Sequence, residues 1–125
     1  MSRESAPRIV TLGGRAGPSL IVDGFRGSGW DVTALVATTD SGSSTGVIRE
    51  QFGLPAPGDI RSVLAAAAEP TPDHLSLASL LEFRFRPSSD SSLANMALGN
   101  LLLAAYAEVL GDFAQAGQAV ARTLR

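Results

Sequence analysis

The chain has 125 residues, 45% of them hydrophobic and 18% charged, which is typical of one small soluble domain with a single core. Its formal net charge of −2 gives no electrostatic field for nucleic acid or an anionic membrane, and the absence of cysteine excludes disulfides and thiolate metal sites. The N-terminal segment lacks an apolar signal core, and apolar runs such as residues 101–105 are far too short to span a bilayer. We therefore expect a cytoplasmic protein that binds neither nucleic acid nor membrane.

After a polar lead-in at residues 1–7, the chain predicts a strand, a helix and a second strand. Residues 8–12 (RIVTL) are a short β-branched run that ends in a glycine pair, as a buried strand entering a tight turn does. A helix is expected over residues 18–28, with Pro18 at its first position, where no N–H is needed. Residues 31–38 (DVTALVAT) predict a second buried strand, parallel to the first because a crossover helix joins them.

The remainder of the chain predicts helices separated by clear breaks. Asp59 is placed to cap the second of these helices, Gly111 to end the fourth and Asp112 to cap the last. Together, two strands and about five helices indicate the α/β class. The expected helices span residues 46–52, 60–69, 73–85, 93–110 and 113–124, with a loop at residues 86–92.

Two parallel strands do not make a stable sheet by themselves, because parallel sheets need cover on both faces and several neighbouring strands. We therefore expect residues 1–125 to be the truncated N-terminal part of a single larger α/β domain. A small helical domain with a β-hairpin is less favoured, because its two strands would have to pair across the intervening helix.

A glycine-rich turn joins the first strand to the first helix. Unpaired N–H groups at a helix start attract an anion, and glycine lets the backbone approach a ligand closely. The alternative is an ordinary strand–helix turn that binds no ligand, since the strict G-x-G-x-x-G spacing of dinucleotide-binding proteins is absent. The candidate ligand-binding residues of this turn are Gly13, Gly14, Arg15, Gly17 and Ser19.

Small polar residues follow the second strand around one carboxylate, that of Asp40. Open α/β sheets bind ligands at this carboxyl end of the strands. A carboxylate there can hold a ribose hydroxyl, coordinate a divalent cation or act as a base. The alternative is a surface turn in which the aspartate bonds its own backbone. The candidates here are Asp40, Ser41, Gly42, Ser43, Ser44 and Thr45, with Asp40 as the one candidate metal ligand.

Two further segments carry candidates. In the Pro57 to Arg61 segment, Asp59 and Arg61 stand out, because a cation in the first turn of a helix is unfavourable unless a ligand or carboxylate partners it. Gly99 and Asn100 are poor residues for the middle of an apolar helix. Either the helix begins near Asn100, or a ligand approaches the backbone there.

Taken together, these segments resemble the CofD-like family, which contains 2-phospho-L-lactate transferase and the YvcK-type gluconeogenesis factors. The family's GGGTG-type loop is similar to residues 13–19 (GGRAGPS), its DDGGSSG-type loop to residues 40–46 (DSGSSTG) and its PPGDIR motif to residues 56–61 (APGDIR). A YRF-type segment matches residues 83–85 (FRF), and an AGHSLGNLLLAAL-type helix matches residues 94–106. The order and spacing agree over nearly the whole chain.

The resemblance implies a Rossmann-like three-layer α/β/α sandwich whose glycine loops hold a nucleotide diphosphate or nucleotide-sugar. In the transferases, a lactyl-phosphate group passes from a guanosine-diphosphate donor to a deazaflavin, with magnesium. The YvcK-type members are implied to be non-catalytic binders of UDP-sugars such as UDP-N-acetylglucosamine. They are implied to act in central carbon metabolism, cell shape and wall synthesis.

This chain departs from the family pattern at two informative places. Arg15 and Ala16 replace the Gly-Thr of the first loop, and Ser41 stands where the family has a second acidic residue. The loss of that carboxylate favours a YvcK-type regulator that binds a nucleotide-sugar, with Asp59 bracing the loop and Arg61 pairing with phosphate or Asp40. No cofactor is expected of such a binder, and a homodimer is left open.

Three alternatives remain. A CofD-type transferase would use Mg²⁺, with Asp40 as a ligand. A nicotinamide-dependent oxidoreductase fits the Rossmann-like start but lacks the fingerprint. The last is a truncated fragment with no activity of its own.

Overall fold

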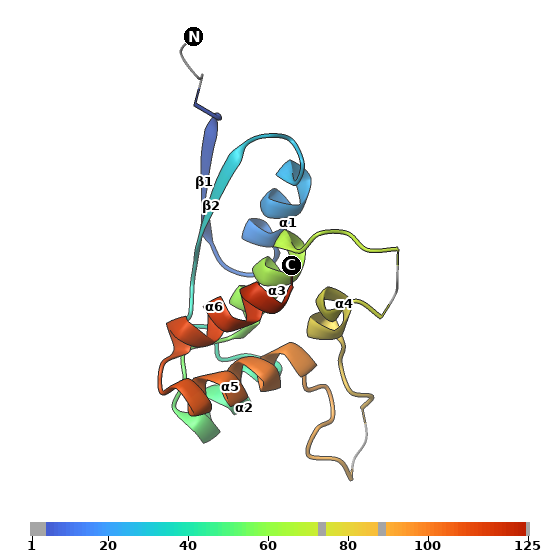
Figure 1. Cartoon of the computed structure of the whole chain (residues 1–125). Coiled ribbons are helices and arrows are strands. Elements are labelled where there is room, and N and C mark those ends of the chain that lie inside the picture. The colour runs from blue at the N-terminus through green and yellow to red at the C-terminus, as the bar shows by residue number, and fades with distance from the viewer. Residues whose placement is uncertain (1–4, 73–74, 88–89, 125) are drawn as a thin grey trace.

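The computed structural model describes residues 5–72, 75–87 and 90–124, in which a two-stranded parallel sheet lies beside six helices (Figure 1). This arrangement confirms the α/β class. Parts of the predicted lead-in, of the helix start at Asp73 and of the loop at residues 86–92 lie outside the described residues. The elements are β1 (Arg8–Gly13), α1 (Ala16–Phe25), β2 (Asp31–Val36), α2 (Ser43–Phe52), α3 (Gly58–Ala67), α4 (Leu77–Glu82), α5 (Leu98–Leu110) and α6 (Phe113–Thr123).

Strands β1 and β2 pair in parallel, from Arg8 opposite Asp31 to Gly13 opposite Val36. Their residues alternate between exposed and half-buried, because successive side chains point to opposite faces and α1 packs against both strands. The expectation of two fully buried strands is therefore wrong. Val10, Leu12 and Leu35 are 64%, 81% and 51% exposed, so one face of the sheet is uncovered within the described residues.

The helices build the core away from the sheet (Figure 1). Helix α5 packs along α6 and also contacts α2 and α4. One buried cluster joins Leu81, Leu103 and Val120, and a second contains Ile48. Since each cluster draws on segments far apart in the sequence, this core holds the loops between the elements in place.

The ends of the last two helices confirm the sequence prediction. Gly111 ends α5 in the left-handed conformation, with φ of 70°, which favours glycine. The Asp112 carboxylate then caps α6 by accepting a hydrogen bond of 2.7 Å from the backbone N–H of Gln115.

In the described residues, no helix is long and apolar enough to cross a membrane.

Several helix starts differ from the prediction. Helix α1 begins at Ala16, so Pro18 is the third residue of the helix and not the first. The first four backbone nitrogens of a helix have no partner within it, so the missing N–H of proline is still tolerated there. Asp59 lies inside the first turn of α3 and makes no capping bond; the N-cap is Pro57. Helix α5 begins only at Leu98, because the preceding residues form turns.

Helix α4 is also shorter than expected and ends at Glu82. The chain beyond it is extended rather than helical, and Arg84 forms an isolated antiparallel bridge with Ala97. This bridge brings the end of α4 beside the start of α5.

Candidate functional site

A cavity of about 430 Å³ opens where the first turns of α1, α2 and α3 meet. Most of the residues that the sequence singled out line it. Gly13, Gly14, Gly17, Ser41 and Asn100 do not. A second cavity of about 490 Å³ is lined mainly by alanine and leucine with a single charged residue, Glu69, so it offers little chemistry. The predicted site residues that line the first cavity are Arg15, Ser19, Asp40, Gly42, Ser43, Ser44, Thr45, Asp59 and Arg61.

Three helix N-termini converge on this cavity. Ala16, Ser43 and Gly58 are the first residues of α1, α2 and α3, and each lines the wall. The first N–H groups of a helix have no partner within the helix and carry a partial positive charge. Three such ends around one space favour an anion with several oxygen atoms, such as a phosphate or diphosphate.

Strained backbone marks the same place. In the described residues, three non-glycine residues have positive φ: Arg15 at 56°, Ser43 at 50° and Asn95 at 61°. Arg15 and Ser43 line the cavity, and the carbonyl of Asn95 accepts a hydrogen bond from Arg84, which also lines it. Such conformations cost free energy and gather where function requires a particular backbone shape.

The loop after β2 is tightly held. One oxygen of the Asp40 carboxylate accepts a hydrogen bond of 3.1 Å from the backbone N–H of Gly42, and Arg49 donates to the carbonyls of Thr39 and Asp40 at 2.9 and 3.2 Å. The self-bonded turn that sequence allowed as an alternative is thus present, yet Asp40 still lines the cavity.

Helix α2 begins at Ser43, three residues before the predicted start, so Ser44 and Thr45 are buried helical residues rather than an exposed loop. Within α2, Gly46 lies directly against the backbone of Ser41: a Cβ on residue 46 would lie 2.2 Å from the Ser41 carbonyl oxygen. Only a residue without a side chain fits that contact.

Asp59 lies against the first glycine turn. A Cβ on Gly14 would lie 2.8 Å from a carboxylate oxygen of Asp59, so the two segments are in direct contact. The bracing role predicted for Asp59 requires such a contact. The structure also places two carboxylates, those of Asp40 and Asp59, on the wall of one cavity.

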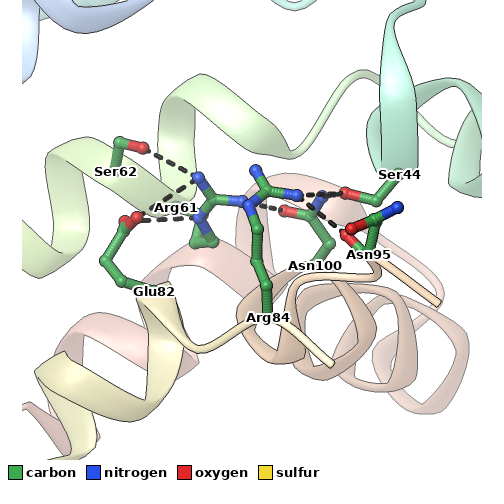
Figure 2. Close-up of polar contacts among 7 residues, drawn as sticks. All are labelled: Ser44, Arg61, Ser62, Glu82, Arg84, Asn95 and Asn100. Atoms are coloured by element: carbon green, nitrogen blue, oxygen red, sulfur yellow. Dashed lines mark hydrogen bonds and ion pairs between the residues drawn. The ribbon is translucent and has the colours of Figure 1, made fainter. Parts of the chain in front are cut away.

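Arg61 is only 6% exposed and is bonded through all three of its nitrogens (Figure 2). It donates to the Glu82 carboxylate at 3.3 and 3.4 Å and to the hydroxyl of Ser62 at 3.0 Å. A further bond of 3.2 Å reaches the side-chain oxygen of Asn100. Of the two partners expected for Arg61, phosphate or Asp40, the second is wrong: the carboxylate that it pairs with is that of Glu82, at the end of α4.

Asn100 is fully buried behind the cavity wall. Its oxygen accepts from Arg61, and its nitrogen donates to the hydroxyl of Ser44 at 2.9 Å (Figure 2). It positions the wall and does not line it. Of the two interpretations of Gly99 and Asn100, the first is confirmed, since α5 begins beside them. What approaches Gly99 is protein: the carbonyl oxygen of Leu81 and Cγ of Arg61 would lie 2.6 and 2.7 Å from an added Cβ.

Comparison with known proteins decides the family. The family model described as 2-phospho-L-lactate transferase CofD matches residues 9–125. The chain belongs to the CofD family. This confirms the resemblance expected from the loop motifs, and with it the Rossmann-like fold.

Relatives within the CofD family are named gluconeogenesis factors. The Bacillus subtilis protein of that name is 37% identical over 118 residues, covering 94% of this chain and 36% of its own length. A putative gluconeogenesis factor of Mycobacterium leprae is 40% identical over 124 residues, covering 99% of this chain and 34% of its own length. A crystal structure of a Bacillus halodurans protein matches with a TM-score of 0.84 and 35% identity, over 97% of this chain and 37% of that one. The chain thus spans about a third of the length of these relatives.

Of the charged residues that line the cavity, Arg84 is the one that was not predicted from the sequence. The sequence FRFR at residues 83–86 overlaps the end of the helix expected over residues 73–85, but the structure shows that it is extended and not helical. Strict alternation of aromatic and charged residues was the available signal, because it is typical of a strand with one apolar and one polar face.

The donor set for a metal is limited. Among the described residues, no three histidine, cysteine, aspartate or glutamate side chains gather in a metal-binding group. Mg²⁺ is usually held by one or two carboxylates together with ligand phosphates. Asp40 and Asp59 therefore fit magnesium only as ligands shared with a bound phosphate compound.

Proposed function

We propose that this chain binds a nucleotide-sugar, with its diphosphate in the cavity between α1, α2 and α3, as part of a YvcK-type regulatory protein. The observation that carries the proposal is the convergence of three helix N-termini on one cavity that also holds three arginines, Arg15, Arg61 and Arg84. A diphosphate offers the oxygen atoms and negative charge that such an arrangement stabilises. The gluconeogenesis-factor relatives support the regulatory role.

The second loop favours a binding role over catalysis. Ser41 occupies the place of the family's second acidic residue, and its hydroxyl accepts a hydrogen bond of 2.5 Å from Arg49. Through that contact, the Ser41 hydroxyl helps to hold the loop in its conformation. Without a second carboxylate beside Asp40, one of the ligands that metal-assisted transfer needs is missing from this loop.

Binding of UDP-N-acetylglucosamine is expected to stabilise the folded chain. At a free concentration one hundred times Kd, the gain is about 2.7 kcal/mol, which raises Tm by roughly 10 °C. Thermal denaturation followed by circular dichroism measures this shift, and uridine without phosphate serves as the ligand control. A Tm unchanged by millimolar UDP-N-acetylglucosamine contradicts the proposal.

Ser43 allows a sharper version of the same test. Ser43→Asp places a carboxylate at the N-terminus of α2, which suits the helix and its positive φ but repels a phosphate in the cavity. We expect apo stability to be kept and affinity to fall by at least about 100-fold. Ser43→Asn, which has the same shape without the charge, is expected to retain binding. Equal affinities of the two variants would contradict a phosphate at this position.

The second candidate is a CofD-type transferase, favoured by the description of the matching family model. In that case Asp40 and Asp59 hold magnesium together with the donor's phosphates, and the metal supplies neutralisation of the phosphate charge. The helix N-termini would then orient the diphosphate in the same way. Incubation with a guanosine-diphosphate-activated lactyl donor, a deazaflavin acceptor and Mg²⁺ tests this alternative. Formation of the phospholactyl product would replace the binding role by catalysis.

A further inference from the structure

The three arginines of the cavity differ in how far their charge is neutralised. Arg61 forms an ion pair with Glu82 and uses all three nitrogens within the protein. Arg15 and Arg84 form no ion pair with any described residue. The charge that is available to a ligand therefore lies on Arg15 and Arg84 and not on the arginine that the PGDIR motif emphasises.

The backbone around Arg84 is pinned in place. The N–H of Leu98 donates to the carbonyl of Phe83 at 2.9 Å, and the N–H of Phe85 donates to the carbonyl of Met96 at 3.1 Å. The rings of Phe83 and Phe85 meet edge to face, with centroids 5.3 Å apart. In an extended segment, alternate side chains point to opposite faces, so the paired rings send Arg84 to the other side, where it lines the cavity.

The guanidinium of Arg84 is held at one nitrogen. Its Nη1 donates to the carbonyl of Asn95 at 2.9 Å and to the hydroxyl of Ser44 at 3.3 Å (Figure 2). Ser44 is itself fixed by Asn100, which Arg61 holds in turn. The chain from Arg61 through Asn100 to Ser44 thus ends at Arg84 and orients it.

We propose that Arg84, and not Arg61, supplies the cationic contact to a phosphate of the ligand. The inference rests on the proposed function and names the residue that recognises the diphosphate. A guanidinium has five N–H donors in a planar fork that matches two phosphate oxygens, and the contacts to Asn95 and Ser44 leave from a single nitrogen. Arg61 is a positioning residue, because its donors are already directed at Glu82, Asn100 and Ser62.

Calorimetric titration of the 125-residue chain with UDP-N-acetylglucosamine tests the assignment, with inorganic diphosphate as a competitor. Arg84→Gln is expected to lower the affinity for both ligands by about 10- to 100-fold, which is the effect of losing one charge-assisted contact. Arg84→Lys keeps the positive charge but lacks the planar fork of donors. Its affinities are expected to lie between those of Arg84→Gln and those of the unsubstituted chain. The matched control is Arg86→Gln, two residues further along at an exposed position outside the cavity, which is expected to change both affinities by less than about twofold.

The outcomes separate the contact from a structural role. If Arg84→Gln leaves both affinities within about twofold of the unsubstituted chain, the assignment is overturned while the proposed function stands. Weaker binding of the nucleotide-sugar with unchanged binding of inorganic diphosphate also overturns it, because the contact would not be to phosphate. An affinity loss that follows a lowered Tm and is fully restored by Arg84→Lys shows a structural role only and overturns it as well. If the unsubstituted chain binds neither ligand, the proposed function fails and this assignment fails with it.

Discussion

Replacement of Glu82 by alanine is expected to destabilise the folded protein by about 3 kcal/mol. The substitution leaves Arg61 buried, with its side chain 7% exposed, and removes its carboxylate partner. An unpaired charge in such a place cannot recover the hydration that it lost on folding. Urea denaturation of the variant and the unsubstituted chain measures the difference in free energy of unfolding.

Removal of the other partner of this ion pair, Arg61, is expected to lower the free energy of unfolding by a smaller amount. Arg61→Met leaves the Glu82 side chain, which is 46% exposed, in contact with water, and the main loss is one buried hydrogen bond to Asn100, worth about 1 to 3 kcal/mol. Glu108→Ala, at an exposed position on α5, is the control and is expected to have little effect. A smaller loss for Glu82→Ala than for Arg61→Met would show that the charge of Arg61 is satisfied by other means.

Gly46→Ala is expected to destabilise the protein by about 3 kcal/mol and to weaken ligand binding. The added Cβ would lie 2.2 Å from the carbonyl oxygen of Ser41, and a backbone atom yields less readily than a flexible side chain. To make room, either the loop around Asp40 or the first turn of α2 must shift, and both line the cavity. Thermal denaturation and titration with UDP-N-acetylglucosamine measure the two effects.

Gly117→Ala is the matched control, because Gly117 also lies inside a helix but has no atom within 4 Å of an added Cβ. We expect it to stabilise the protein by about 0.5 to 1 kcal/mol through the higher helix propensity of alanine. The two glycines should therefore respond with opposite signs. Stabilisation by Gly46→Ala would mean that the contact with Ser41 relaxes without cost.

The first strand–turn–helix–strand unit and the last helix pair were largely predictable from sequence. Their signals are local: β-branched runs, a glycine pair, the left-handed Gly111 and the capping aspartate Asp112 all act on adjacent residues. The starts of α2 and α5 were not, because small and polar residues such as Ser43 and Asn95 suit both a helix and the turn before it.

The roles of the site residues depend on contacts that local spacing does not specify. Arg61 pairs with Glu82, 21 residues away, and Asn100 bonds Ser44, 56 residues away. The sequence left Asn100 between a helix start and a ligand contact, and the structure buries it behind the cavity wall at the start of α5. Similarly, the sequence emphasised Arg61 and passed over Arg84, since nothing in the local sequence shows which guanidinium finds a carboxylate partner.

The sequence by itself determined the family, the α/β class and most of the segments that line the cavity, because these follow from the order of glycine and hydroxyl loops between short elements. The tertiary structure alone decided that three helix N-termini meet at one cavity and that two of its three arginines have no ion-pair partner among the described residues. It also showed that one face of the sheet is uncovered within the described residues. The physical reason is the same in each case: packing and charge pairing join residues that are distant along the chain, whereas turns, caps and periodicity join neighbours.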